Sequence, residues 1–221
     1  MKKLINIFLT FFIVSILSFE LETSNCFAQQ LPQYSQYLIN DYVLNPAVAG
    51  SKGYFEAKSN HRYQWVGIVD ALRTYVLSVN GPLKSEKVGV GGFLLSDRTG
   101  PTSSLGAHLS YAYHFNLSES AKLSLGLFGG IMQYSVDGSK ITLNDKADPL
   151  SGGMESVVIP DAGFGLYLYS ANYFLGASVP QLFQNRLKLF ETDTTEALGQ
   201  LKSHLFVTGG YKFALGAVFE I

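Results

Sequence analysis

The segment 102–115 alternates strictly between two kinds of residue. From Leu105 onward its odd positions are apolar, and its even positions are small or polar. Because successive side chains of a β-strand point to opposite faces, this period predicts a strand with one apolar and one polar face. About ten residues of such alternation, with tyrosines at one end, are typical of an outer-membrane β-barrel strand. The lipid-facing candidates are Leu105, Leu109, Tyr111, Tyr113 and Phe115, and the interior-facing candidates are Ser104, His108, Ser110 and His114.

The composition favours the same fold class. Charged residues make up 15% of the 221 residues, and the chain carries 22 Gly and 13 Tyr. A typical soluble domain has about 25% charged residues, so this low share suits a surface that partly faces lipid. The formal net charge is −1 and the sequence has no basic run, so we expect no nucleic-acid partner.

The N-terminus has the features of a secretory signal. Lys2 and Lys3 precede an apolar stretch, residues 4–19, that is too short for a membrane-spanning helix. Small residues before Gln29 predict cleavage after Ala28, which makes residues 1–28 a signal peptide. A lipoprotein signal ending at Cys26 is the alternative. With cleavage after Ala28 the single cysteine is lost, so the mature chain is expected to have no disulfide and no cysteine-bound metal.

The remaining sequence is divided into a lead-in segment, residues 29–51, and part of a barrel, residues 52–221. Turn residues separate short β-type runs throughout the second part. We expect strands at 54–63, 73–80, 88–97, 102–115, 122–137, 158–169, 172–179, 204–213 and, cut short, 217–221. The fold class is therefore an all-β, antiparallel up-and-down transmembrane β-barrel that is C-terminally incomplete. Segment 180–190 is a short helix or loop, and the longer loops 137–159 and 193–203 lie outside the bilayer.

No catalytic, cofactor or metal site is predicted. His108 and His114 share a face, but six residues of strand separate them by about 20 Å, too far for one metal ion. His108 and Ser110 are neighbours on that face, about 7 Å apart along the strand, and could form a nucleophilic pair. No third orienting group follows from the sequence, so polar interior residues are the favoured interpretation. Acidic residues of loop 137–159 lack the spacing of a calcium-binding loop.

Three further groups of residues have structural interpretations. Trp65, with Tyr63 and Tyr75, is expected at the membrane–water boundary, although a soluble sandwich core would also use these rings. Charged residues near strand ends are expected in solvated turns rather than in interior ion pairs: Arg62, Arg73, Asp97 and Arg98. Strand glycines are expected to relieve crowding in a narrow barrel: Gly126, Gly129, Gly130, Gly163 and Gly165.

Several short sequence motifs follow one another along the chain. Their positions are Pro32, Gln33, Tyr34, Asn45, Pro46, Gly50, His61, Arg62, Gln64, Trp65, Gly67, Asp97, Arg98, Gly100 and Pro101, followed by segments 81–84, 172–181 and 208–213. Together they resemble the PorP/SprF family of the type IX secretion and gliding machinery of Bacteroidota. The resemblance covers nearly all of the mature chain.

The resemblance implies a non-enzymatic barrel in the cell outer membrane. It implies as partners the outer-membrane lipid, a secreted adhesin-like cargo, and periplasmic or outer-membrane components of type IX secretion. Members of the family run longer, so it also implies further strands at the C-terminal end. Three alternatives stay open at this point: a general diffusion porin, a membrane-embedded hydrolase that uses His108 and Ser110, and a soluble periplasmic β-sandwich.

Overall fold

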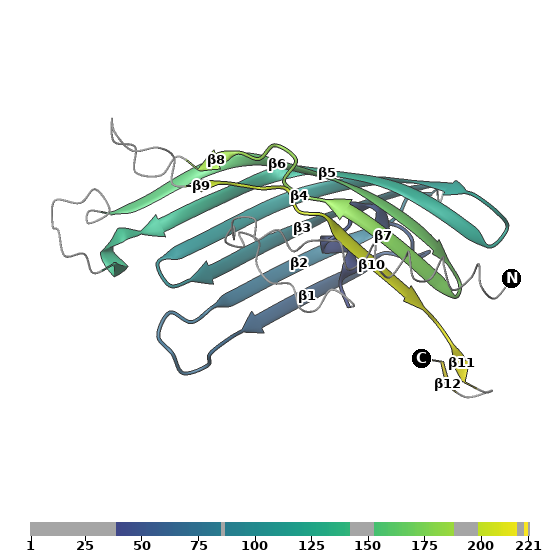
Figure 1. Ribbon diagram of the computed structural model, residues 1–221, viewed down its shortest axis with the longest axis horizontal. Coiled ribbons are helices and arrows are strands. Elements are labelled where there is room, and N and C mark those ends of the chain that lie inside the picture. Colours follow the sequence, from purple (N-terminus) through teal and green to yellow (C-terminus); the bar gives the residue numbers. More distant parts are fainter. Residues whose placement is uncertain (1–38, 85–86, 142–152, 188–198, 216–218, 221) are drawn as a thin grey trace, which may run out of the picture. The chain divides into compact units, whose positions relative to one another are not determined.

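The computed structural model describes residues 39–84, 87–141, 153–187, 199–215 and 219–220. Eight of its strands form one antiparallel sheet in the order β1-β2-β3-β4-β5-β6-β7-β10, curled into half of a barrel (Figure 1). The bounds are β1 Glu56–Tyr63, β2 Arg73–Pro82, β3 Val88–Thr99, β4 Thr102–Asn116, β5 Ala121–Asp137, β6 Met154–Ser170, β7 Tyr173–Val179 and β10 Phe206–Tyr211. Each strand pairs with the next sheet strand along the chain, so the predicted up-and-down meander is confirmed.

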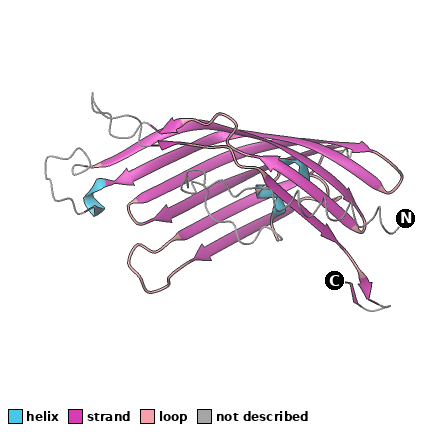
Figure 2. Ribbon diagram, viewed as in Figure 1, coloured by secondary structure: helices cyan, strands magenta, loops and turns pink. Residues whose placement is uncertain are grey.

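The other elements are short (Figure 2). Two strand pairs stand apart from the main sheet: β8 (Arg186–Leu187) with β9 (Gly199–Gln200), and β11 (Ala214–Leu215) with β12 (Phe219–Glu220). The 3₁₀ helices of the described ranges are η1 (Asp41–Val43), η2 (Pro46–Val48) and η3 (Gly138–Lys140). Among the described residues, no helix combines the length and the apolar character needed to cross a membrane.

The structure corrects three boundaries. Strand β6 begins at Met154, so the loop predicted over 137–159 is shorter. Segment 180–190 is predicted as a short helix or a loop. Its residues 180–185 form a loop, Arg186–Leu187 form the two-residue strand β8, and residues 188–190 lie outside the described residues. Of the last predicted strand, 217–221, the structure describes only Phe219–Glu220, which form β12 and pair with β11 and not with the large sheet. In each case the deciding factor is strand pairing, which periodicity within one segment does not report.

The large sheet has two different faces, which β4 shows most clearly. His108, Ser110 and His114 are 4%, 8% and 3% exposed, whereas Leu109 is 76% exposed. We call the buried side the inner face and the opposite side the outer face. Apolar side chains of every strand from β2 to β7, and of β10, are exposed on the outer face: Leu77, Val79, Leu94, Leu105, Leu109, Leu127, Ile131, Val158, Leu166, Leu175 and Val207.

Two small apolar clusters lie on the inner side. The first joins the lead-in segment to the sheet through Tyr42, Phe93 and Tyr167. The second contains Met132, Ile159 and Leu201. The buried apolar side chains therefore come from both the sheet and chain segments that lie against it.

Candidate functional site

The described part of the lead-in segment, residues 39–51, packs on the inner face of the sheet. Its residues 44–50 cross the strands instead of running along them, and a row of small residues lies beneath. The row follows direct cross-strand pairs from β3 to β7: Gly89, Ala112, Gly126, Gly165 and Ser178. Neighbouring strands are about 4.8 Å apart, so five strands span about 19 Å, which seven residues of chain can cover.

The glycines of this row leave room for the backbone of the lead-in segment. A Cβ atom on Gly89 would lie 1.8 Å from the Ala49 oxygen, and one on Gly126 would lie 2.2 Å from the Ala47 nitrogen. At Gly165 it would lie 2.0 Å from Asn45 Oδ1. Gly126 and Gly165 therefore have a more specific role than the predicted relief of crowding: any side chain there would displace the segment that crosses them.

Asn45 fixes the middle of the lead-in segment. Its Oδ1 atom accepts a hydrogen bond from the Ala47 amide at 3.0 Å and thereby caps η2. Its Nδ2 group donates to the Leu166 carbonyl of β6 at 2.9 Å. Next to it, the Ser178 hydroxyl of β7 donates to the Leu44 carbonyl at 2.7 Å. These bonds satisfy backbone groups of a segment that has no strand partner of its own.

Tyr42 anchors η1 on the sheet. Its hydroxyl and the Ser110 hydroxyl of β4 are 2.6 Å apart, and its ring contacts Phe93 edge-on at 6.1 Å between centroids. Burial raises the pKa of Tyr42 to about 12, so the phenol keeps its proton at neutral pH.

His114 holds the end of the segment. Its Nε2 atom is 2.9 Å from the Ala49 carbonyl oxygen, and the Tyr169 hydroxyl is 3.0 Å from its Nδ1 atom. In the tautomer with the proton on Nε2, the ring donates to Ala49 and accepts from Tyr169.

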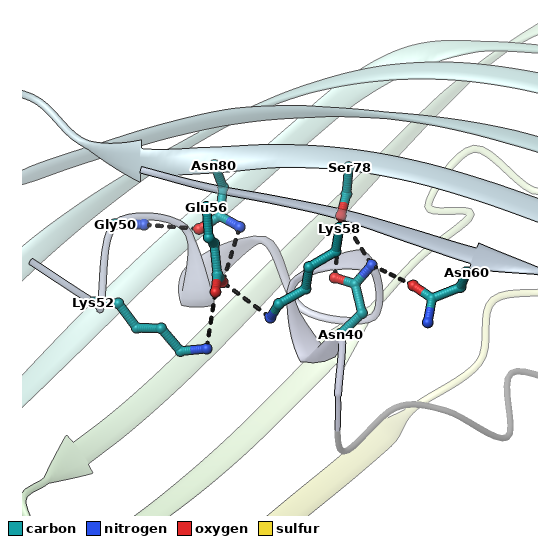
Figure 3. A network of polar contacts seen from close by, with 8 residues as sticks. All are labelled: Asn40, Gly50, Lys52, Glu56, Lys58, Asn60, Ser78 and Asn80. Atoms are coloured by element: carbon teal, nitrogen blue, oxygen red, sulfur yellow. Dashed lines mark hydrogen bonds and ion pairs between the residues drawn. The ribbon is translucent and has the colours of Figure 1, made fainter. Parts of the chain in front are cut away.

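Two polar networks tie the lead-in segment to β1 and β2 (Figure 3). In the first, the Asn40 amide donates to Asn60 Oδ1 at 2.9 Å and to the Ser78 hydroxyl at 2.8 Å. All three residues are at least nine-tenths buried. Buried amides of this kind stabilise a structure only when they are bonded, and here they specify which strand positions the segment meets.

The second network is charged (Figure 3). The Gly50 amide donates to Asn80 Oδ1 at 3.4 Å, and the Asn80 amide donates to Glu56 at 3.3 Å. Glu56 also forms ion pairs with Lys52 and Lys58, each at 3.0 Å. One carboxylate thus joins the end of the lead-in segment to the first strand.

His108 and Ser110 are not bonded to each other among the described contacts. His108 Nε2 is 3.0 Å from Asp161 of β6, and its ring stacks on Phe93 with centroids 4.5 Å apart. Ser110 instead bonds Tyr42. Asp161 supplies an orienting group that the sequence did not reveal, but the hydroxyl that a hydrolase would need is engaged elsewhere. No group of three or more His, Cys, Asp or Glu in the described ranges could hold a metal ion.

An ordered loop, residues 64–72, connects the end of β1 to the start of β2. Trp65 and Asp70 have φ angles of 53° and 56°, and Gly67 has 100°. The Gln64 amide donates to the Leu72 carbonyl at 3.0 Å, and the Asp70 carbonyl accepts from the Gly100 amide at 3.0 Å. Residues outside glycine rarely adopt positive φ, so two in one loop show a backbone held by its surroundings.

The other predicted residues are placed as follows. Ser104 is half-buried on the inner face, while Tyr111, Tyr113 and Phe115 are exposed on the outer face. Asp97 accepts a hydrogen bond from the Thr74 hydroxyl at 2.5 Å, so it lies on the inner face and not in a solvated turn. Among the remaining positions, the side chains of Arg73, Arg98 and His61 are exposed, and that of Arg62 is half-buried. Gly50 and Gly100 have positive φ angles. Pro46 is buried in η2, and the Pro101 carbonyl accepts a hydrogen bond from the Asp137 amide. Pro32, Gln33 and Tyr34 lie outside the described residues, as do residues 1–28.

Sequence reasoning missed most of the anchoring residues. Asn40, Tyr42 and Asp161 have no local pattern that marks them, because each contacts a residue far away in the chain. The small-residue row was visible only as scattered glycines. These residues line up only when strands β3 to β7 are paired in the correct register, and that register is set by the tertiary structure.

Comparison with known proteins gives one match. A family model described as type IX secretion system membrane protein PorP/SprF matches residues 26–221. No curated protein and no solved structure matches the chain.

Proposed function

Since this chain belongs to the PorP/SprF family of type IX secretion system membrane proteins, we propose that it is a non-enzymatic barrel of the outer membrane. In this proposal it supports the secretion or surface attachment of a partner protein such as an adhesin. Its partners are that secreted cargo, other type IX secretion components and the surrounding lipid.

The two-sided sheet carries the membrane part of the proposal. Leu105, Leu109 and Ile131 are each more than half exposed on the outer face, where water would make such a wide apolar surface unfavourable. A sheet in hydrocarbon needs every backbone group paired, which is why membrane β-proteins close into barrels. The eight-stranded sheet supplies one continuous half of such a wall.

The filled inner face favours a docking component over a diffusion porin. A porin keeps polar side chains of its interior facing water. Here inner-face groups such as Ser110, His114 and Ser178 are bonded to the lead-in segment. Where the lead-in segment crosses the sheet, these polar groups are therefore not available to line a water-filled channel.

Loop lengths suggest an orientation. Four connections leave the sheet at one end, which we call the loop end. Three of them, β1–β2, β5–β6 and β7–β10, are long, and the β3–β4 turn is short. At the other end, the turn end, β2–β3, β4–β5 and β6–β7 are short. Bacterial barrels place long loops outside the cell and short turns in the periplasm, so the loop end is the side available to a secreted partner.

Deletion of the gene in its host tests the secretory role. We expect one or a few secreted surface proteins to disappear from the cell surface while other outer-membrane proteins stay at their normal level. Plasmid-borne wild type restores them. An unchanged set of surface proteins and unchanged motility would contradict the proposal.

Two measurements separate the remaining alternatives. Membranes washed with alkaline carbonate should retain the protein, and its gel mobility should change on heating; a soluble sandwich would wash off. In planar bilayers we expect no stable open channel, whereas a diffusion porin would conduct.

A further inference from the structure

Two arginines face each other on the outer face at the loop end. Arg73 of β2 and Arg98 of β3 are direct cross-strand partners, and both are exposed. Like charges in this position repel each other and destabilise a sheet. The arrangement therefore needs negative charge nearby, and part of it comes from the β1–β2 loop.

Asp70 supplies that charge but does not balance the cluster. Its carboxylate is 2.7 Å from the Lys140 ammonium of η3. The hydrogen bond from Lys140 and the charges of Lys140, Arg98 and Arg73 hold the pKa of Asp70 below its usual value. Asp70 thus stands among three cations. A second carboxylate, Asp137, caps η3 and accepts hydrogen bonds from the Ser139 amide and hydroxyl. Three cations against two carboxylates leave a local excess of positive charge.

Direct cross-strand partners on the outer face form rows, and the chemical character of these rows changes in a regular order toward this cluster. Leu77, Leu94 and Ala107 form an apolar row of direct partners. The next row on this face is Tyr75, Ser96 and Leu105. The row after that contains Tyr63, Arg73, Arg98 and Ser103. Apolar, then aromatic and mixed, then cationic is the order in which a membrane protein passes from hydrocarbon to headgroups.

The neighbouring rings and loop residues fit the same boundary. The Arg73 guanidinium lies 5.8 Å from the centre of the Tyr63 ring, and the hydroxyls of Tyr63 and Tyr75 are hydrogen bonded. Beyond them, Trp65 and Ile68 are 66% and 60% exposed in the ordered loop. Amphipathic and apolar side chains beside cations match a surface that meets both acyl chains and phosphate.

We propose that Arg73 and Arg98, with Lys140 beside them, bind the phosphate group of an anionic membrane lipid at the loop end of the sheet. Guanidinium groups suit this role because they bind phosphate oxygens in pairs. Asp70 positions Lys140 and keeps the cluster assembled in the absence of lipid. This inference rests on the membrane placement proposed above and adds to it a specific lipid contact.

Trp65 is the single tryptophan of the chain and reports on this site. The full chain is reconstituted in phosphatidylcholine vesicles that contain a small fraction of brominated lipid, which quenches tryptophan fluorescence on contact. We expect brominated phosphatidylglycerol to quench Trp65 more strongly than brominated phosphatidylcholine, because the cations enrich anionic lipid around the loop. Equal quenching should require a fraction of brominated phosphatidylcholine that is about tenfold larger.

The variant Arg73→Gln/Arg98→Gln should lose this preference, so that both brominated lipids quench equally. The matched control is Lys84→Gln/Lys87→Gln, which removes the same charge from two exposed lysines of the β2–β3 turn, at the turn end. It should keep the wild-type preference. Heat-dependent gel mobility verifies that each variant is folded.

Different failures have different meanings. Equal quenching by both lipids in the wild type, or a preference that survives in the arginine variant or disappears equally in the control, would overturn the lipid site and leave the membrane placement intact. Loss of the preference on adding inorganic phosphate at constant ionic strength would assign the site to a free anion, which also overturns the inference. No quenching by either lipid would count against both the lipid site and the membrane placement of this end.

Discussion

Asn45 uses both ends of its side-chain amide to hold a segment that has no strand partner. One end caps η2 and the other bonds the backbone of β6. The residue is 4% exposed, so water does not replace a lost bond easily. Single polar residues of this kind, and not apolar contacts alone, fix where the lead-in segment crosses the sheet.

Replacing Asn45 by Ala should lower the free energy of unfolding by about 1–3 kcal/mol, because buried backbone groups lose their partner. Urea unfolding in detergent micelles, followed by heat-dependent gel mobility, measures the change. Asn116→Ala, at the exposed end of β4, is the matched control and should unfold near the wild-type midpoint. Equal midpoints for both variants would show that the Asn45 bonds contribute nothing.

Asp41 should make stability depend on pH. Burial raises its pKa above the ordinary value of 3.8, against the attraction of Lys52 and Lys58. A raised pKa in the folded state favours the folded chain at low pH, and this contribution is lost as pH rises through the folded pKa. Asp41→Asn should therefore be more stable than wild type at pH 7, with the difference shrinking toward pH 4. A variant less stable than wild type at pH 7 would mean that the lysine attraction outweighs burial.

At the scale of elements, the lead-in segment and the sheet depend on each other's shape. The segment needs a flat path across five strands, and small residues in register provide it. At the β3 end of that path, Gly50 adopts a φ of 75°. A Cβ on Gly50 would also lie 2.6 Å from the Gly89 Cα atom, so glycine faces glycine where the two backbones meet.

Gly126→Ala should destabilise the protein by about 1–3 kcal/mol through overpacking. It should also make the lead-in segment accessible to protease, because the new methyl group would lie within 2.5 Å of Ala47 and Pro46 backbone atoms. Gly129→Ala, in the same strand, is the control, since a Cβ there meets nothing within 4 Å. Cleavage rates and urea midpoints measure both effects. If the two variants behave alike, the small-residue row does not seat the segment.

At the scale of the whole molecule, the two faces of the sheet carry different side chains. The inner face is occupied by the chain's own lead-in segment and polar networks. The outer face presents apolar side chains from strand to strand, with charge gathered near the loop end. This division is consistent with the family, which is described as a membrane protein of the type IX secretion system.

Leu109→Lys tests this division directly. Leu109 is 76% exposed near the middle of β4. A lysine at the bilayer midplane of a barrel costs about 2–4 kcal/mol, so the variant should fold into vesicles less efficiently than wild type. Leu117→Lys, in the β4–β5 turn and 60% exposed, should fold normally. Heat-dependent gel mobility after refolding gives the folded fraction, and equal fractions would place the outer face in water.

Local sequence pattern determined the strands and their two-sidedness. Alternation in segment 102–115 predicts which residues of β4 share a face, since the side-chain period of a strand is a property of the backbone itself. Turn residues likewise placed the strand ends to within a few residues. The meander order followed from consecutive β-type runs with no segment typical of a helical crossover between them. The sequence motifs also pointed to the family that the chain belongs to.

Only the tertiary structure decided what covers the inner face. The row from Gly89 to Ser178 exists because five strands pair in one register, and register depends on contacts between segments far apart in the chain. The same holds for the bonds of Asn40 and Tyr42, whose partners are 38 and 68 residues away. A local pattern specifies the direction of a side chain, but its neighbour is chosen by how the whole sheet assembles.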